Sequence, residues 1–209
     1  MAPSEEEAQV IVNKAVTQFS AAAPALLSRY LADVLEWNSV LSLVSRKDPL
    51  AACERLLFES IELGQLLDVA EVSRLADVGS GAGFPGMVWA LMAPQLKTVL
   101  IERREKRALF LERTSRALGA ANVTELASDL KDVSRETPLL DPFELVTAVA
   151  VGDPAEIADD VSRLLIVGGR FASTVAREAR MPAQLGPNLT LEKRVEGKFG
   201  CYVVYRRGV

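Results

Sequence analysis

Residues 75–86 decide the fold of this chain, and they read Leu-Ala-Asp-Val-Gly-Ser-Gly-Ala-Gly-Phe-Pro-Gly. The apolar run at 75–78 predicts a β-strand that leads straight into a glycine-rich turn, and Pro85 stands where a helix would begin. Because glycine has no Cβ atom, backbone amides in such a turn can approach a ligand closely, and the helix N-terminus adds a partial positive charge. The stretch therefore predicts a ligand-binding loop at the carboxyl end of a strand.

Two classes of nucleoside-containing ligand fit this loop. Gly81, Gly83 and Gly86 match the G-x-G-x-x-G spacing of dinucleotide-binding folds, so an NAD-dependent oxidoreductase is one interpretation. In that frame, however, the strand would end late and a proline would interrupt the turn. The other frame, Asp-x-Gly-x-Gly-x-Gly, begins with Asp77 at the strand end and is typical of S-adenosylmethionine-dependent methyltransferases. Its acidic residue can attract the cationic amino-acid end of that cofactor, so this frame favours S-adenosylmethionine.

Carboxylates after the next two predicted strands complete the expected cofactor site. Glu102 closes the strand at 98–102, where a carboxylate can accept hydrogen bonds from both hydroxyls of a ribose. Asp129 follows the strand at 123–127 and can accept from an adenine amino group, although a solvated loop acid is an equal alternative. The residues that we predict to bind the cofactor are Asp77, Gly79, Ser80, Gly81, Gly83, Phe84, Glu102, Asp129 and Leu130.

Beyond this loop, short β-rich runs alternate with helical stretches. Further strands are expected at 143–148 and 169–175, and helices at 85–92, 105–118 and 153–165. This alternation predicts a parallel sheet covered on both faces, and the runs at 189–195 and 199–206 predict an antiparallel hairpin that closes it. The expected class is an α/β, Rossmann-like methyltransferase fold with a mostly parallel seven-stranded sheet.

The first seventy residues have the apolar spacing of three amphipathic helices. We predict that residues 1–70 form an N-terminal helical cap. Residues 71–209 are then expected to form the S-adenosylmethionine-binding domain, and the two parts to pack as one compact unit.

The amino-acid composition excludes several classes of protein and of catalytic group. The chain has 209 residues with 24 Lys and Arg against 28 Asp and Glu, so its net charge is −4. This balance argues against a protein that binds nucleic acid through overall positive charge. Histidine is absent, which removes His-ligated metals and imidazole bases, and two cysteines are too few for a disulfide scaffold. We expect a metal-free cytoplasmic protein with neither a secretory signal nor a membrane span.

The loop and its surroundings together resemble the glucose-inhibited division protein B family, bacterial enzymes that methylate N7 of a guanine in 16S ribosomal RNA. The resemblance lies in residues 77–86, where Phe-Pro-Gly follows the glycines, and in Glu102 followed by residues 106–112. Residues 37–38 and 55–60 also occur in the family's order. The resemblance implies S-adenosylmethionine as cofactor, 16S ribosomal RNA or the small ribosomal subunit particle as partner, and a monomer.

Four positions expected to face the substrate depart from the family pattern. Residues 42–44 read Ser-Leu-Val where the family usually has Asn-Leu-Thr, and Leu56 replaces a common histidine. Val149 stands where the family carries an arginine, and Val175 where it carries a lysine. A non-catalytic or retargeted paralogue that binds S-adenosylmethionine without this RNA activity is therefore an alternative.

Methyl transfer to guanine N7 needs no general base, because N7 carries a lone pair and no proton. We therefore assign no catalytic residue and expect catalysis by in-line positioning of the reactants. We expect basic side chains near the cofactor, and around the site where the RNA binds, to contact its phosphates or bases. These candidate RNA contacts are Arg46, Lys47, Arg103, Arg104, Lys106, Arg107 and Arg177.

Overall fold

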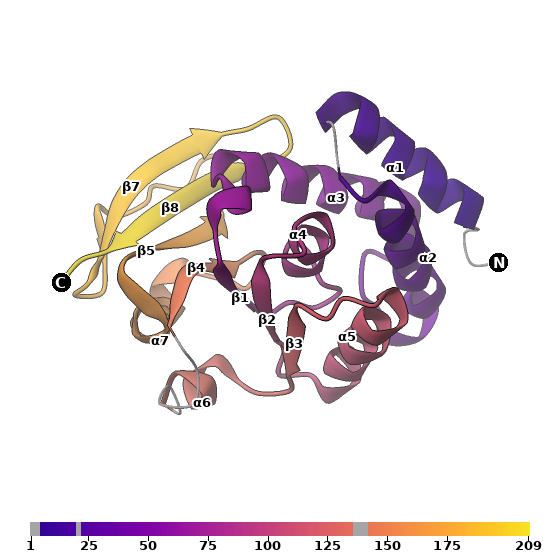
Figure 1. Ribbon diagram of the computed structural model, residues 1–209. Helices are drawn as coiled ribbons and strands as arrows, with labels where there is room; N and C mark the ends of the chain where they lie inside the picture. Colours follow the sequence, from indigo (N-terminus) through magenta and orange to yellow (C-terminus); the bar gives the residue numbers. More distant parts are fainter. Residues whose placement is uncertain (1–4, 20–21, 136–141) are drawn as a thin grey trace.

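The computed structural model describes residues 5–19, 22–135 and 142–209, which fold around one mixed β-sheet (Figure 1). Its strands are β1 (Arg74–Val78), β2 (Lys97–Ile101), β3 (Val123–Leu126), β4 (Phe143–Ala148), β5 (Leu165–Thr174), β6 (Gln184–Leu185), β7 (Leu189–Glu196) and β8 (Cys201–Arg207). Their order is β3-β2-β1-β4-β5-β8-β7-β6. Strands β1–β5 are parallel, whereas β8 pairs antiparallel with both β5 and β7. The predicted fold class and hairpin are confirmed, and the two-residue β6 extends the seven expected strands to eight.

Helices cover both faces of this sheet. They are α1 (Glu5–Phe19), α2 (Pro24–Leu41), α3 (Pro49–Leu66), α4 (Gly86–Met92), α5 (Glu105–Leu118), α6 (Leu130–Arg135) and α7 (Pro154–Leu164), with a 3-10 turn η1 (Val69–Glu71). Successive strand residues point to opposite faces, so Leu75 and Leu100 pack in one core with α2–α5, while Ala76 and Val99 pack in a second core with α6 and α7. The central parallel strands β1, β2 and β4 are therefore largely buried between two helical layers, as expected for parallel strands.

Short-range signals in the sequence set several helix ends. The α3 helix begins where the Ala51 amide donates to Asp48 Oδ1 at 3.0 Å, and α7 begins where the Ala155 amide donates to Asp153 Oδ1 at 2.9 Å. In both helices a proline takes the first turn, where its missing N–H leaves no bond unmade. The α5 helix ends at Gly119, whose φ of 69° suits a glycine.

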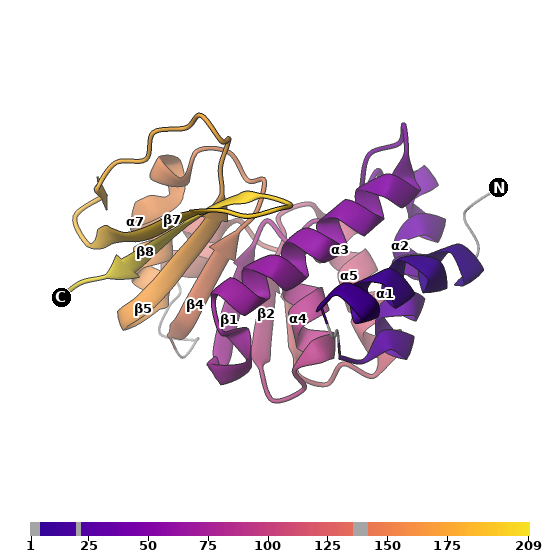
Figure 2. The ribbon, with the colours of Figure 1, turned by 90° about the horizontal axis from the view of Figure 1, so that it is seen from above.

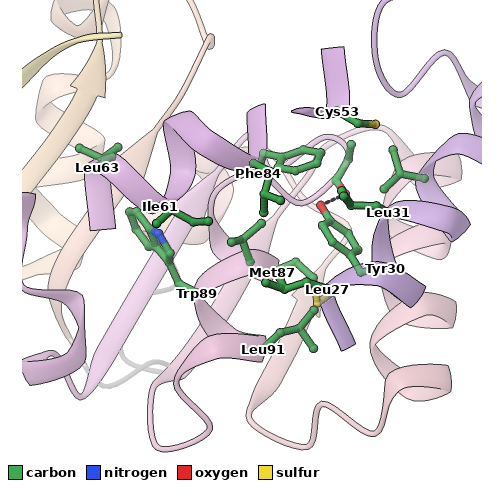
Figure 3. Packing of buried hydrophobic residues seen from close by; sticks show 14 of the residues in the cluster. Leu27, Tyr30, Leu31, Cys53, Ile61, Leu63, Phe84, Met87, Trp89 and Leu91 are labelled. Carbon is green, nitrogen blue, oxygen red and sulfur yellow. Dashed lines mark hydrogen bonds between the residues drawn. The ribbon is translucent and has the colours of Figure 1, made fainter. Parts of the chain in front are cut away.

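The N-terminal helices hold the loop after β1 and the helix that follows it. The Tyr30 hydroxyl of α2 donates to the Ala82 carbonyl at 2.9 Å, and the Trp89 indole of α4 donates to the Ser60 carbonyl of α3 at 2.7 Å. Both aromatic side chains are buried among aliphatic residues (Figure 3). The division of the chain into a cap of residues 1–70 and a domain of residues 71–209 stays a prediction.

The helices α1 and α2 lie on the side of the molecule away from the β7–β8 hairpin, and α3 runs across between the two (Figure 2). One strand differs from expectation: β5 begins at Leu165, earlier than the predicted start at 169, because Leu165 already pairs with Phe143 before the register shifts. None of the helices in the described part of the chain is long and apolar enough to cross a membrane.

Candidate active site

The loop after β1 depends on glycine at two positions for physical reasons. Gly79 has a φ of 67°, and a Cβ atom there would lie 2.7 Å from Val151 Cγ2. Gly83 has a φ of 105°, and a Cβ atom there would lie 2.9 Å from the Tyr30 hydroxyl oxygen. Side chains rarely adopt these backbone conformations, and the space beside both glycines is already filled. The loop is thus held close to the β4–α7 connection on one side and to α2 on the other.

Asp77, at the end of β1, lies beneath this loop. The Thr147 hydroxyl donates to Asp77 Oδ1 at 2.8 Å, and the Gly86 amide donates to Oδ2 at 3.2 Å. Burial raises the pKa of this carboxyl to about 6, although the hydrogen bonds from Thr147 and Gly86 oppose the change. Its carboxylate joins β1, β4 and the start of α4, and a direct contact with a cofactor stays a prediction.

Glu102, at the end of β2, ties the same loop to the neighbouring strand. Its side chain is buried, the Gly81 amide donates to Oε2 at 2.9 Å, and the Arg104 amide donates to Oε1 at 2.8 Å. A carboxylate has about four acceptor sites, so these two bonds leave capacity for further donors. Glu102 is therefore fixed in position and still able to accept hydrogen bonds from a ligand.

A cleft of about 540 Å³ opens beside the loop at the carboxyl ends of β1, β2 and β4, and we call it the glycine-loop cleft. Four residues predicted to bind the cofactor line it: Gly79, Glu102, Asp129 and Leu130. Val78, Ile101, Val151 and Ile157 add apolar wall. The cleft thus combines buried acceptors with apolar surface, which suits a ligand with a hydroxylated sugar and a flat ring.

Asp129 has a structural role as well as a place in this cleft. The Lys131 amide donates to its Oδ1 at 3.0 Å, at the start of α6, and Arg103 Nη1 lies 3.9 Å from its Oδ2. Its side chain keeps 40% of its surface exposed. Asp129 can therefore accept from a ligand on its outer side while holding the loop before α6.

Two other residues of the predicted cofactor loop, Ser80 and Phe84, face inward. The Ser80 hydroxyl donates to the Asp77 carbonyl at 2.7 Å, and the Phe84 ring packs against Tyr30 with centroids 5.3 Å apart. Together with Gly81 and Gly83, these residues lie outside the lining of the glycine-loop cleft. Their predicted contact with the cofactor stays a prediction, and the structure gives them a role in holding the loop.

The basic residues proposed for RNA contact divide into separate groups. Arg103, Arg104 and Arg107 line the glycine-loop cleft, and Arg107 Nη2 donates to the Ser42 carbonyl at 2.7 Å. Three others are exposed elsewhere: Arg46, Lys47 and Lys106. Arg177 lies apart from both groups, where its Nη2 donates to the Gly197 carbonyl in the hairpin turn at 3.0 Å.

Arg177 borders a second hollow of about 810 Å³, which we call the hairpin cavity. Its walls come from α3, the end of β5, the chain after β5 and the β7–β8 turn; they include Glu59, Thr174, Val175, Arg177, Arg180, Phe199, Gly200 and Cys201. The β4–α7 connection separates the two hollows, because residues 150–151 line the glycine-loop cleft and residues 152–153 line the hairpin cavity. Sequence reasoning missed this cavity, since its walls come from segments far apart in the chain.

Three of the four positions that depart from the family pattern line this cavity or the small hollow beside it, whereas residues 42–44 line neither. Leu56 and Val149 line one small hollow with Glu59, Phe84 and Pro85. Val175 lines the hairpin cavity itself. Leu56 and Val149 pack against the core on the α2–α5 side of the sheet and Val175 against the core on the α6–α7 side, and Glu59 lines both hollows.

Solved structures with this fold include several methyltransferases. A putative O-methyltransferase from Klebsiella pneumoniae matches with a TM-score of 0.62 over 98% of this chain and 99% of its own, at 14% identity. The putative methyltransferase YhhF from Escherichia coli matches with a TM-score of 0.59 over 72% of this chain and 86% of its own, at 17% identity. A variant of MtNAS in complex with S-adenosylmethionine gives 0.63 over 99% and 84%, at 14% identity. The fold is that of the Rossmann-like methyltransferases.

Sequence comparison identifies the family, whereas the structural matches show only the fold. Residues 24–182 match the model of the GidB family, rRNA small subunit methyltransferase G. A relative of that name from Sorangium cellulosum is 37% identical over 153 residues, which cover 73% of this chain and 63% of the relative. The relative from Chloroflexus aggregans is 31% identical over 154 residues, or 74% of this chain and 64% of its own. The chain belongs to the GidB family, and its matched region spans less than two thirds of these relatives.

Proposed function

We propose that this protein is an S-adenosylmethionine-dependent methyltransferase that modifies N7 of a guanine in 16S ribosomal RNA. The observation that carries the proposal is the open glycine-loop cleft with the buried Glu102 carboxylate in its wall. Membership of the rRNA small subunit methyltransferase G family supports the choice of RNA. We further propose that the protein acts as a monomer in the cytoplasm on this RNA or on the small ribosomal subunit particle.

The residues of the cleft fit the proposed cofactor. Glu102 keeps acceptor capacity for two ribose hydroxyls, and Asp129 keeps an exposed oxygen for an amino group. Leu130 and Ile157 supply apolar surface for an adenine ring. When bound, S-adenosylmethionine supplies an activated methyl group on a sulfonium.

The chain's own contribution is position and exclusion of water. Guanine N7 carries a lone pair and no proton, so a chain without histidine can support this reaction. The glycine-loop cleft and the hairpin cavity lie on the two sides of the β4–α7 connection, which suits a donor in one and a base in the other. Alignment of this kind supplies about 7–11 kcal/mol of a barrier in favourable reactions.

Basic side chains around the hollows provide the grip on RNA. Arg177 and Arg180 border the hairpin cavity, while Arg46, Lys47 and Lys106 are exposed. Contacts of such residues with phosphate position a nucleic acid and carry no sequence information. Selection of the base therefore depends on groups inside the cavity.

A methyl-transfer assay tests the proposal. Small-subunit RNA and 30S particles from cells that lack the protein would be incubated with it and with tritiated S-adenosylmethionine. The expected result is incorporation at a single guanine, mapped by nuclease digestion and mass spectrometry to N7. Binding of S-adenosylhomocysteine without incorporation into either substrate would instead fit a retargeted paralogue and would overturn the RNA activity.

A further inference from the structure

Glu59 of α3 is a carboxylate at the junction of two hollows. The residue is 8% exposed, and it lines both the hairpin cavity and the small hollow beside Phe84 and Pro85. Burial raises the pKa of this carboxyl, while the nearby Arg55 guanidinium lowers it. A buried carboxylate in the wall of a cavity carries a desolvation penalty that a ligand with suitable donors would offset.

The two oxygens of Glu59 differ in their surroundings. Arg55 Nη1 donates to Oε2 at 2.9 Å. Oε1 points toward the hairpin turn, since a Cβ atom on Gly200 would lie 2.8 Å from it. Among the described residues none donates a hydrogen bond to Oε1. The oxygen beside the cavity wall therefore keeps its acceptor capacity.

Two other carboxylates near the hairpin accept hydrogen bonds that hold the fold together. Glu62, one turn further along α3, accepts from the Lys198 amide at 2.8 Å, the Phe199 amide at 3.1 Å and the Tyr202 hydroxyl at 2.6 Å. Asp153, the other acid in the cavity wall, accepts from the Ala155 amide at the start of α7. Asp153 is exposed, so among the described residues Glu59 is the buried carboxylate of the cavity wall.

The chemistry of guanine matches such an acceptor. Guanine presents two adjacent donors, N1–H and the 2-amino group, on its Watson–Crick edge, and enzymes that modify a base commonly read that edge. Adenine presents an acceptor at N1 and no donor at C2, so a carboxylate would repel it. N7 lies on the opposite edge of guanine and stays open to the methyl donor when the Watson–Crick edge is held.

We propose that Glu59 accepts hydrogen bonds from the Watson–Crick edge of the target guanine in the hairpin cavity and thereby selects guanine over adenine. This inference rests on the proposed function and deepens it, because it names the group that identifies the base. Arg55 holds Oε2 of the carboxylate, and Oε1 lies close to Gly200 of the hairpin turn, so the orientation of the carboxylate in the cavity wall is fixed.

The test couples residue 59 to the 2-amino group of the base. After the methylated guanine has been located, ligated small-subunit RNA is prepared with guanine or inosine at that position, since inosine lacks only the 2-amino group. For the wild-type protein, inosine is expected to lower kcat/KM by about ten- to a hundredfold. Glu59→Gln is expected to lower kcat/KM on guanine by a similar factor and to leave guanine and inosine within about threefold of each other.

Two further variants separate recognition from structure. Glu54→Gln removes the same charge from α3 and breaks its ion pair with Lys14 at 2.9 Å, and it should keep the full preference for guanine. Glu59→Asp retains the carboxylate and should keep part of that preference if the Gln variant does not fold. Affinity for S-adenosylhomocysteine should stay within about twofold in all three variants.

The possible outcomes distinguish a failure of the proposed methyltransferase function from a failure of the proposed role of Glu59. A wild-type protein that methylates no RNA overturns the proposed function and this inference with it. An active wild-type protein that ignores the 2-amino group, or a folded Glu59→Gln variant that keeps the wild-type preference, overturns the inference alone.

Discussion

The glycine-loop cleft and the hairpin cavity are built in different ways. The cleft is formed largely by segments that follow β1, β2, β3 and β4, and backbone amides and carboxylates fix its geometry. The hairpin cavity joins α3 to the chain after β5 and to the β7–β8 turn, and its walls are side chains from distant segments. The first site therefore depends on local backbone conformation, whereas the second depends on tertiary packing.

The largest expected difference between the two regions is in affinity for S-adenosylhomocysteine when one glycine in each region is replaced by valine. Gly79→Val places a branched side chain at a φ of 67° and against Val151, so the loop must move. We expect affinity for S-adenosylhomocysteine to fall at least about a hundredfold, about 3 kcal/mol, measured by calorimetry.

Gly152→Val is the matched control for this change. Gly152 also has a positive φ, 101°, but a Cβ atom there meets nothing within 4 Å, and the residue lines the hairpin cavity. Valine is strained at this φ as well, but it meets no neighbouring atom, so affinity for S-adenosylhomocysteine should fall much less than in Gly79→Val, with thermal melting to confirm that both variants are folded. Equal losses in the two variants would mean that the glycine loop is not what holds the cofactor.

Asp77 gives the cleft region a pH dependence of stability. Its pKa is raised from 3.8 to about 6, so the folded protein retains a proton that the unfolded chain loses above about pH 4. The stability contributed by the protonated carboxyl is present below about pH 4 and is lost as pH rises through about 6. Relative to Asp77→Asn, the wild-type protein should therefore lose about 3 kcal/mol of unfolding free energy between pH 4 and pH 7.

The Asp77→Asn variant can keep both hydrogen bonds of the carboxylate. The Thr147 hydroxyl can rotate to accept from the new amide, while the amide oxygen accepts from the Gly86 N–H. Urea denaturation of both proteins across the pH range measures the difference. A difference that does not change with pH would show that Asp77 is ionised alike in the folded and unfolded states.

A smaller difference is expected when a buried tyrosine hydroxyl is removed from each of the two regions. Tyr30 donates to Ala82 in the glycine loop, and Tyr205 donates to Pro182 in the chain after β5, both at 2.9 Å. Replacing either tyrosine by phenylalanine leaves a carbonyl without its donor and should cost about 1 kcal/mol of unfolding free energy.

Ligand affinity then distinguishes the two tyrosine variants. Tyr30→Phe should weaken S-adenosylhomocysteine binding by a few-fold because the loop loses a support, while Tyr205→Phe should leave that binding unchanged. Calorimetry on both proteins checks this, and a loss confined to Tyr205→Phe would contradict the division into two regions.

The difference between locally built and distantly assembled regions explains how much of the fold and of the site the sequence could predict. The order of strands and helices, the glycine loop and the two acids that follow β2 and β3 are all encoded in short contiguous segments. Local sequence could not show which loop residues face inward: Ser80 and Phe84 belong to the predicted motif, yet their contacts are with Asp77 and Tyr30. Their direction depends on how α2 packs against the loop.

The hairpin cavity was beyond sequence reasoning for a related reason. Glu59 and Gly200 are distant in the chain and become neighbours only because α3 runs alongside the hairpin turn. Val149 and Val175 depart from the family pattern in the sequence, but the hollows that they line can be found only from the fold. Patterns that repeat along a helix or strand reveal burial, whereas contacts between distant segments leave no such period.

We propose that the glycine-loop cleft binds S-adenosylmethionine with Glu102 as an acceptor. Calorimetric titration of S-adenosylhomocysteine tests it directly, with Glu102→Ala as the variant, the exposed neighbour Glu105→Ala as its control, and thermal melting to confirm that each protein is folded. We expect S-adenosylhomocysteine to bind the wild-type protein and Glu105→Ala equally, and to bind Glu102→Ala at least about tenfold more weakly. The wild-type protein should not bind NADH. Undiminished affinity in folded Glu102→Ala, or a wild-type protein that binds NADH and not S-adenosylhomocysteine, would contradict it.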